Sequence, residues 1–362
     1  MILDLLNHPA DLWTTLKETD EPIFLYGMGD GAEKVLDALD RIGKIPEGVY
    51  ASDEFVRGHS FKGYPVRRFS EVCASYPSFI ALLCFAVDYE PMLSYLTKMS
   101  EDHNLFAPDV PVIRTDDTLF DTAFVKEHEA QFDAVYDRLA DEQSKAVYRD
   151  IIAAKLTGQI DRMRRCESSR EEALALLHLH GDETYVDLGA YNGDTVEEFI
   201  RTVNGNYRAI YAFEPDKKNF QKLCARVEQN GFQNVHPFCI GAWNEADTLF
   251  FKGGKGGRNS MLSKTGTKQV SVDSVDHVLN GAPVTLLKLD VEGAETRALQ
   301  GAAHTIRTHR PRIIAAAYHK NGDLFEIPET VLSICDEYDV YLRHHPYLPA
   351  WETNFYFVPK MS

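Results

Sequence analysis

From Glu183 onward, predicted strands and helices alternate five times, and this alternation constrains the fold more than any other feature of the chain. The predicted strands cover residues 185–188, 209–213, 235–240, 284–289 and 312–318, with a final pair at 340–343 and 355–358, and the predicted helices cover 195–203, 217–230, 294–309 and 328–337. Strands that alternate with helices form a mainly parallel sheet with helices on both faces. We therefore predict an α/β fold with a doubly wound, Rossmann-like sheet, whose ligands bind beyond the carboxyl ends of the strands.

A smaller α/β unit is predicted near the N-terminus. Residues 23–26 are a predicted strand, and the turn that follows carries Gly27, Gly29 and Ala32 before a predicted helix at 33–41. Further predicted strands cover residues 48–51, 64–66, 79–85 and 110–113. A glycine turn between a strand and a helix fits the dinucleotide-binding pattern, but short units of this kind also keep such a turn for helix packing alone.

The segment between these two units has a different pattern. Residues 117–178 contain no proline and one glycine, Gly158, and their apolar residues recur at helical spacing. We predict a small Rossmann-like domain over residues 1–116, a helical connector over 117–180 and a larger sheet domain over 181–362. The connector helices are also the predicted surface for any oligomer.

Composition excludes several classes of function. The chain of 362 residues has 38 Lys and Arg against 55 Asp and Glu, so its formal charge is 38 − 55 = −17, which argues against a nucleic-acid partner. No apolar run reaches the roughly 18 residues of a membrane span, and the N-terminal segment lacks the pattern of a signal peptide. The six cysteines are scattered without a Cys-x-x-Cys pair. We therefore expect a cytoplasmic protein without a disulfide framework or a zinc knuckle.

The first strand of the larger sheet ends in a turn suited to a ligand. Gly189 and Gly193, four residues apart, let the backbone pass close to a bound group because neither has a Cβ atom. Asp194 and Glu197 fit a capping box for the helix that follows, and the N–H groups at such a helix start suit a carboxylate. Asp187 can accept hydrogen bonds from an ammonium group or from the turn itself.

The next two strand ends predict a nucleoside site. Glu214 follows the second strand, where an acidic side chain can accept hydrogen bonds from both hydroxyls of a ribose. The third strand ends at Gly241 and Ala242, beside which an adenine ring can lie flat. The neighbouring Trp243 either stacks on that ring or packs in the core.

Three sequence blocks carry a resemblance to a known family. The segments Asp187-Leu-Gly-Ala-Tyr-Asn-Gly193, Phe213-Glu-Pro215 and Leu287-Lys-Leu-Asp-Val-Glu-Gly-Ala-Glu295, with Gly301-Ala302, resemble the FkbM family of S-adenosylmethionine-dependent methyltransferases over about residues 183–359. The third block is the most specific of them. The resemblance implies a class I methyltransferase fold and methyl transfer to an oxygen of a sugar or another hydroxylated natural product.

The resemblance also assigns cofactor-binding residues. It implies that Asp187, Gly189 and Gly193 line the methionine half of S-adenosylmethionine and that Glu214 binds the ribose. Together with the strand ends above, the predicted cofactor-binding residues are Asp187, Gly189, Asn192, Gly193, Asp194, Glu214, Gly241 and Ala242. The chain departs from the family where Tyr318-His319-Lys320 follows the fifth strand, because many members have a glutamate there.

The fourth and fifth strand ends predict the catalytic residues. Asp290 ends the fourth strand and His319 follows the fifth, so both side chains should project into one cleft if these strands are neighbours. A hydroxyl must lose its proton as it attacks a methyl group, and a histidine suits the task of general base. Asp290 would orient His319 or hold the hydroxyl. Glu292 is a third candidate, although a carboxylate at a helix start also has a structural use.

The sequence does not decide whether a metal ion binds at the same place. Asp290, Glu292 and His319 carry oxygen and nitrogen donors that magnesium or a transition metal accepts, although their spacing is not specific. The glycine-rich loop at 252–258 carries three cations, Lys252, Lys255 and Arg258. These side chains would bind a phosphate group, or the loop is a plain hairpin without a ligand. Residues Asn259 to Met261, directly after the loop, would contact a ligand bound there. His344 and His345 line the substrate mouth or lie on the surface.

The sequence favours an S-adenosylmethionine-dependent O-methyltransferase that acts on a hydroxyl of a sugar, a glycan precursor or a related natural product. Two alternatives remain at this point. One is an NAD-dependent oxidoreductase that uses the turn at Gly27 to Ala32, with Asp53 reaching a ribose. The other is a scaffold whose methyltransferase fold has lost its activity.

Overall fold

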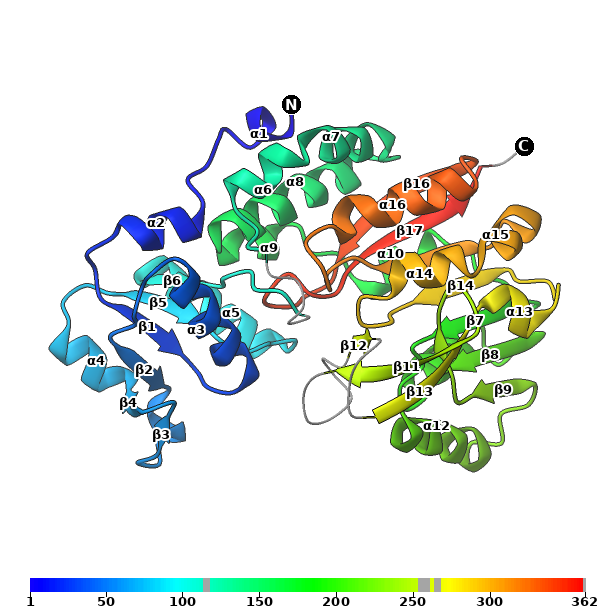
Figure 1. The fold of residues 1–362 in the computed structure, drawn as a ribbon, viewed down its shortest axis with the longest axis horizontal. Coiled ribbons are helices and arrows are strands. Elements are labelled where there is room, and N and C mark those ends of the chain that lie inside the picture. The colour runs from blue at the N-terminus through cyan, green and yellow to red at the C-terminus, as the bar shows by residue number, and fades with distance from the viewer. Residues whose placement is uncertain (113–117, 253–260, 264–267, 361–362) are drawn as a thin grey trace. The chain divides into compact units, whose positions relative to one another are not determined.

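The computed structural model describes residues 1–112, 118–252, 261–263 and 268–360 (Figure 1). The chain forms two compact units. Unit 1 comprises Met1–Asp137, Glu142–Ser169 and His344–Glu352, and unit 2 comprises Arg138–Asp141, Arg170–Arg343 and Thr353–Ser362. Residues 142–169 of the predicted connector thus belong to unit 1, whereas residues 170–180 belong to unit 2. Among the described residues, no helix is long and apolar enough to cross a lipid bilayer.

Unit 1 is built on a six-stranded sheet with the order β3-β4-β2-β1-β5-β6. Its pairs are parallel except for β3 with β4, which is antiparallel. The strands are β1 (Ile23–Tyr26), β2 (Gly48–Ala51), β3 (Ser60–Phe61), β4 (Tyr64–Arg68), β5 (Ile80–Leu83) and β6 (Asn104–Phe106). The helices described in or beginning in this unit are α1 (Ile2–Leu5), α2 (Leu12–Glu18), α3 (Asp30–Arg41), η1 (Asp53–Phe55), α4 (Phe69–Ser75), α5 (Glu90–Asp102), α6 (Thr122–Glu127), α7 (Glu129–Arg138), α8 (Glu142–Thr157) and α9 (Ile160–Arg165).

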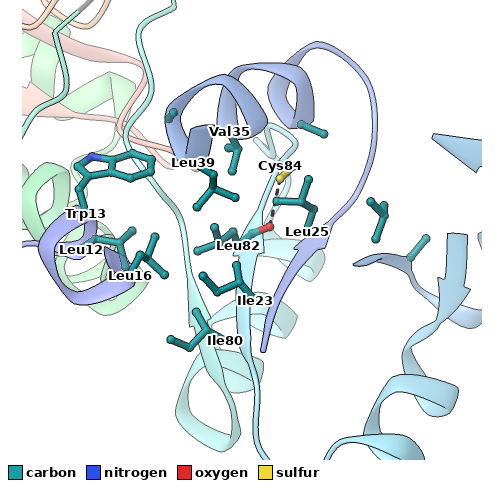
Figure 2. Packing of buried hydrophobic residues seen from close by; sticks show 14 of the residues in the cluster. Leu12, Trp13, Leu16, Ile23, Leu25, Val35, Leu39, Ile80, Leu82 and Cys84 are labelled. Atoms are coloured by element: carbon teal, nitrogen blue, oxygen red, sulfur yellow. Dashed lines mark hydrogen bonds between the residues drawn. The ribbon is translucent and has the colours of Figure 1, made fainter. Parts of the chain in front are cut away.

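The core of unit 1 lies between its sheet and two helices. Figure 2 shows Leu12, Trp13 and Leu16 of α2 and Val35 and Leu39 of α3 packed around the side chains of β1 and β5. Both strands are continuously apolar and buried along their whole length, as expected for parallel strands covered on both faces. The predicted small α/β unit therefore has its own hydrophobic core.

One predicted strand of unit 1 is wrong. The sequence predicted a strand at 110–113, but described residues 110–112 form none, and β6 at Asn104–Phe106 occupies the sheet edge instead. Leu105 is buried there and pairs with Ala81 of β5. Pro108 and Pro111 follow, and proline cannot donate to a strand ladder, which accounts for the early end of the strand.

Unit 2 contains the predicted doubly wound sheet, and the predicted α/β fold is confirmed. The seven strands have the order β16-β17-β15-β14-β7-β8-β9, in which β7, β8, β9, β14 and β15 are parallel and β17 runs antiparallel to β15. The strands are β7 (Thr184–Leu188), β8 (Ala209–Phe213), β9 (Val235–Phe238), β14 (Leu286–Leu289), β15 (Arg312–Ala316), β16 (Tyr338–His344) and β17 (Thr353–Pro359). The helices are α10 (Arg170–Ala175), α11 (Asp194–Thr202), α12 (Lys217–Gln229), α13 (Val275–Leu279), α14 (Glu295–Gln300), α15 (Ala303–His309) and α16 (Asp323–Ile334).

A second, four-stranded sheet in unit 2 was not predicted. Its order is β10-β13-β11-β12, with β10 (Gly241–Ala242), β11 (Asp247–Lys252), β12 (Met261–Ser263) and β13 (Lys268–Asp273). Leu249, Val270 and Val272 form a small buried cluster on this sheet. The alternation of Val270 and Val272 with polar residues was the sequence signal that could have revealed β13.

Two predicted helices of unit 2 have different bounds. The helix predicted at 294–309 is divided at Gly301 and Ala302 into α14 and α15, because the Asp276 carboxylate binds the backbone N–H groups of His304 and Thr305 (both 2.8 Å) and so starts a new helix. The helix predicted from Pro328 begins at Asp323 and contains Pro328 inside it. Burial of apolar side chains in its first turns, those of Leu324, Phe325 and Ile327, accompanies this earlier start.

A buried carboxylate joins three strands at the amino end of the main sheet. Glu183, fully buried just before β7, accepts hydrogen bonds from the Thr285 hydroxyl before β14 and from the Arg312 guanidinium of β15 (2.5 Å). It also accepts one from the His180 backbone N–H (3.0 Å). A buried charge of this kind stabilises a fold only while its partners stay in place.

Replacing Glu183 should therefore destabilise unit 2 strongly. We expect Glu183→Ala to lower the free energy of unfolding by about 3–5 kcal/mol, because it leaves Arg312, whose side chain is only 12% exposed, without its counter-ion. The matched control is Glu198→Ala, which breaks an exposed pair with Arg170 (3.5 Å) and should cost less than about 1 kcal/mol. Urea unfolding followed by circular dichroism measures both values. Equal losses in the two variants would contradict the role of Glu183.

Candidate functional site

The turn after β7 lies against the end of β14. A Cβ atom on Gly189 would lie 1.9 Å from the carbonyl oxygen of Asp290, and Gly189 has a φ of +88°. The Asp290 N–H donates to the carbonyl of Leu188 (3.0 Å). The N–H groups of Gly189 and Ala190 both donate to the carbonyl of Phe213 (3.0 Å each). The carboxyl ends of three neighbouring strands are thus held together at a position that only glycine can occupy without displacing Asp290.

The buried side chain of Asp187 stabilises this turn through hydrogen bonds. The side chain is fully buried, and its carboxylate accepts hydrogen bonds from the Thr195 hydroxyl of α11 (2.5 Å) and from the Lys288 ammonium of β14 (3.2 Å). The sequence left two partners open for Asp187, a ligand ammonium or the protein itself. In the structure its partners are groups of the protein, so the carboxylate orders the turn and the start of the helix.

The predicted capping box at α11 is wrong. The N-cap is Gly193 in the left-handed conformation (φ +84°), which has no side chain with which to cap, and Asp194 is the first helical residue. The Asn192 side-chain oxygen accepts from the Asp194 N–H (3.2 Å), and the Asp194 carboxylate accepts from the Thr195 N–H (2.9 Å). Two N–H groups expected to be open to a ligand carboxylate are therefore bonded within the turn.

Glu214 stands at the carboxyl end of β8, as predicted. Its carboxylate accepts the backbone N–H of Asp216 at 2.7 Å, and its side chain is mostly buried. Burial raises the pKa of Glu214 to about 7, because the loss of water outweighs the hydrogen bonds from the N–H groups of Asp216 and Tyr191. A carboxylate in this position can accept hydrogen bonds from the two hydroxyls of a ribose.

The third strand end differs from the prediction. β9 ends at Phe238, and Gly241 and Ala242 pair with β13 in the second sheet rather than extending β9. Trp243 packs against the apolar cluster of that sheet, and the Arg297 guanidinium lies 5.9 Å from the centroid of its ring. Of the two roles considered for Trp243, the structure supports packing.

Asp290 and His319 lie together at the ends of β14 and β15, which are neighbours in the sheet as expected. His319 Nε2 is 3.5 Å from Asp290 Oδ1 and 3.9 Å from Glu292 Oε2. The three side chains differ in access to solvent, because His319 is 2% exposed whereas Asp290 and Glu292 are 35% and 31% exposed. The two carboxylates can therefore meet a substrate, and the imidazole lies behind them.

Two buried acids that the sequence did not single out hold this cluster in place. Glu295 accepts the backbone N–H groups of Val291 (2.9 Å) and Gly293 (3.3 Å), and its Oε1 lies 3.0 Å from His319 Nδ1. Asp323 accepts the N–H groups of His319 (2.8 Å) and Lys320 (2.7 Å). Glu295 belongs to the family-like block, but no local pattern marks Asp323 except its position four residues after His319.

The surroundings of His319 oppose its predicted role as general base. Burial alone lowers the pKa of an imidazole, but Glu295, Asp290 and Glu292 surround His319 and raise its pKa to about 10. The neighbouring cation in turn holds the pKa of Glu295 below its usual value, although burial acts in the opposite direction. The raised pKa favours the imidazolium form of His319, which forms ion pairs with the carboxylates around it.

The glycine turn of unit 1 is explained by packing. A Cβ atom on Gly27 would lie 2.6 Å from the ring of Phe85, and one on Gly31 would lie 2.2 Å from the carbonyl oxygen of Cys84. Asp53 accepts the backbone N–H of Ser70 (3.1 Å), and the first turn of α3 contains two acidic residues, Asp30 and Glu33. These acids disfavour a phosphate at that helix start, so the local geometry does not require a nucleotide.

The remaining candidates lie elsewhere. His344 and His345 are buried within unit 1 rather than exposed, and His345 Nδ1 lies 3.0 Å from the carbonyl of Ser168. Burial lowers the pKa of His344 to about 3. The predicted phosphate clamp of Lys255 and Arg258 and the neighbouring Asn259 and Ser260 lie outside the described residues. Lys252 and Met261 pair through their backbones in β11 and β12.

Comparisons with known proteins agree with the fold. The family model of the methyltransferase FkbM domain matches residues 187–349. The chain is similar over 99% of its length, and over 97% of the other chain, to the crystal structure of Methyltransferase FkbM from Methylobacillus flagellatus KT, with a TM-score of 0.74 and 20% identity. At that identity the likeness establishes the fold, and it extends over both units. No curated protein matches the chain.

Weaker structural matches cover about half of the chain. An rRNA methylase from Streptococcus thermophilus matches 53% of this chain and 95% of its own, with 14% identity and a TM-score of 0.36. The SMU.1697c protein of Streptococcus mutans in complex with SAH matches 54% of this chain and 99% of its own, with 14% identity and a TM-score of 0.33. A likeness at these scores adds nothing to the fold described above.

The contact between Gly189 and Asp290 yields a prediction for stability. Gly189→Ala should lower the free energy of unfolding well beyond the roughly 1–2 kcal/mol that a left-handed conformation costs, because the new Cβ atom collides with the Asp290 carbonyl. The control is Gly205→Ala, which has a similar φ of +75° but open space around its Cβ position. Urea unfolding compares the two. Equal destabilisation would show that the close approach is unimportant.

Proposed function

Because residues 187–349 match the family model of the methyltransferase FkbM domain, we propose that the protein is an S-adenosylmethionine-dependent O-methyltransferase. Its proposed substrate is a hydroxyl group of a sugar, a glycan precursor or a related natural product. One observation carries the proposal. The carboxyl ends of the neighbouring strands β8, β7 and β14 carry, in that order, the acid Glu214, the glycine turn at Gly189 and the acid Asp290.

The residues present fit the nucleoside half of the cofactor. Glu214 keeps an ionisable carboxylate at the edge of the sheet, in reach of a group that lies over the β7 turn. Ribose hydroxyls donate to such a carboxylate, and the turn at 189–193 lets a ligand approach the backbone. When bound, S-adenosylmethionine supplies a methyl group attached to a positively charged sulfur.

The exposed carboxylates at the end of β14 fit the acceptor. Asp290 and Glu292 are each about one-third exposed, and carboxylates accept hydrogen bonds from the hydroxyls of a polyol. S-adenosylmethionine, held at Glu214 and the turn at 189–193, would supply the methyl group to the substrate oxygen. The hydroxyl proton passes to Asp290 and then to solvent.

In this proposal His319 has a positioning role. Its buried ring lies between Glu295 and Asp290, and its backbone N–H is held by Asp323. An imidazole fixed in this way orients Asp290 toward the substrate rather than taking the proton itself. The predicted group of three, Asp290, Glu292 and His319, thus acts with Asp290 as proton acceptor, Glu292 as hydroxyl ligand and His319 as support.

The pKa of Glu214 predicts how cofactor binding depends on pH. Ribose hydroxyls donate to the ionised form, so the affinity for S-adenosylhomocysteine (SAH) should rise with pH through about 7 and be about tenfold weaker at pH 6 than at pH 8. Glu214→Gln should weaken binding by about 1.5–3 kcal/mol and flatten this profile.

Isothermal titration calorimetry with SAH measures these affinities. The control is Glu228→Gln, on the exposed face of α12, which should keep both the affinity and the pH profile of the unchanged protein. A flat profile in the unchanged protein would contradict the role of Glu214. Stabilisation of the protein against heat by NAD but not by SAH would contradict the proposed function itself.

Transfer of a labelled methyl group tests the reaction. The unchanged protein should move label from S-adenosylmethionine to at least one member of a panel of sugars, sugar nucleotides and carbohydrate extracts. Asp290→Asn should reduce turnover by about 10²-fold or more and leave SAH affinity within about twofold, because it removes the proton acceptor but not the nucleoside site. Unchanged turnover in Asp290→Asn would remove that residue from the mechanism.

A further inference from the structure

We propose that Asp290, Glu295 and His319 bind a divalent metal ion. Each residue offers one donor atom, and the three atoms all lie within 4.8 Å of one another. One nitrogen and two carboxylate oxygens form a mixed donor set, which suits manganese, cobalt, nickel or zinc better than the all-oxygen sites that calcium and magnesium prefer.

The cluster is ordered before any ion arrives. Glu295 is held by the N–H groups of Val291 and Gly293, and the backbone on either side of His319 is held by Asp323. Both ring nitrogens of His319 face carboxylates, because Nδ1 lies 3.0 Å from Glu295 Oε1 while Nε2 lies 3.5 Å from Asp290 Oδ1 and 3.9 Å from Glu292 Oε2. The imidazole gives up a proton when it becomes a ligand, so binding of the ion should release a proton.

A separate observation points to a missing cation. Glu295 is 1% exposed, and its Oε2 atom is buried without a hydrogen-bond partner in the part of the chain that the structure describes. A buried carboxylate oxygen without a partner is costly, and a metal ion would supply the partner. Three acids, Asp290, Glu292 and Glu295, surround the single imidazole of His319, so the local charge also favours a cation.

A metal ion can reach the proposed site from solvent on the side where Asp290 lies. Asp290 is partly exposed, so an ion can enter from its side while Glu295 and His319 form the buried wall. Glu292 Oε2, 3.9 Å from His319 Nε2, is near enough to become a fourth ligand after a small side-chain movement.

The metal site stands on this geometry, whereas its use in methyl transfer rests on the proposed function. A substrate hydroxyl that binds a divalent ion loses its proton more readily, because the ion stabilises the alkoxide. With the ion bound, Asp290 would serve as a ligand, the ion would hold the hydroxyl in place of Glu292, and the hydroxyl proton would pass to solvent. The binding of the ion must therefore be measured separately from turnover.

Titration with Mn²⁺ tests the proposal. Full-length protein without an affinity tag is treated with EDTA and dialysed, and the free ion is followed by electron paramagnetic resonance. We expect one Mn²⁺ per chain to bind, and we expect Asp290→Asn and His319→Ala each to weaken this binding at least tenfold. Glu228→Gln, which removes an exposed carboxylate on α12, should bind as tightly as the unchanged protein.

Three outcomes would overturn the site: no binding of Mn²⁺ or Zn²⁺ at millimolar concentration, equal binding by the unchanged protein and both variants, or equal loss of binding in Glu228→Gln. The first would show that the cluster is a buried ion pair. Circular dichroism of every variant checks folding, and Asp290→Asn keeps the test decisive if His319→Ala does not fold, because Asp290 is partly exposed. SAH binding by the same samples tests the proposed function independently, since it does not involve these three residues.

Discussion

The carboxyl edge of the unit 2 sheet depends on how closely the ends of β7 and β14 approach each other. The approach occurs at Gly189, where a side chain would occupy the position of the Asp290 carbonyl oxygen. Because the two backbones touch, the turn after β7 and the acids after β14 border the same space. A cofactor over the turn and an acceptor beside Asp290 would then be neighbours, as direct methyl transfer requires.

Buried carboxylates hold the two ends of this sheet in different ways. At the amino end, Glu183 binds side chains from the starts of two strands and has no access to solvent. At the carboxyl end, Glu295 and Asp323 bind backbone N–H groups and leave Asp290 partly exposed. The first arrangement serves stability. The second orders a loop next to a ligand and concentrates negative charge there, which is a property of functional sites.

Part of the site could be predicted from strand ends alone. The positions of Glu214 and Asp290 follow from the rule that ligands bind at the carboxyl ends of parallel strands, and the meeting of Asp290 with His319 follows from the adjacency of β14 and β15. The second sheet was missed because two of its strands, β10 and β12, have only two and three residues, and because the alternating pattern of β13 rests on Val270 and Val272 alone. The division between α14 and α15 was missed because it depends on Asp276, a side chain 25 residues before Gly301.

By itself, the sequence determined the alternation of strands and helices, the glycines of the β7 turn and the types of side chain at each strand end. These features are local, since they depend on periodicity and on the space that a residue occupies. Only the tertiary structure decided that Trp243 packs, that Gly193 replaces the expected cap and that carboxylates raise the pKa of His319. Each of these depends on groups distant in the sequence, because burial and neighbouring charge arise only when the chain has folded.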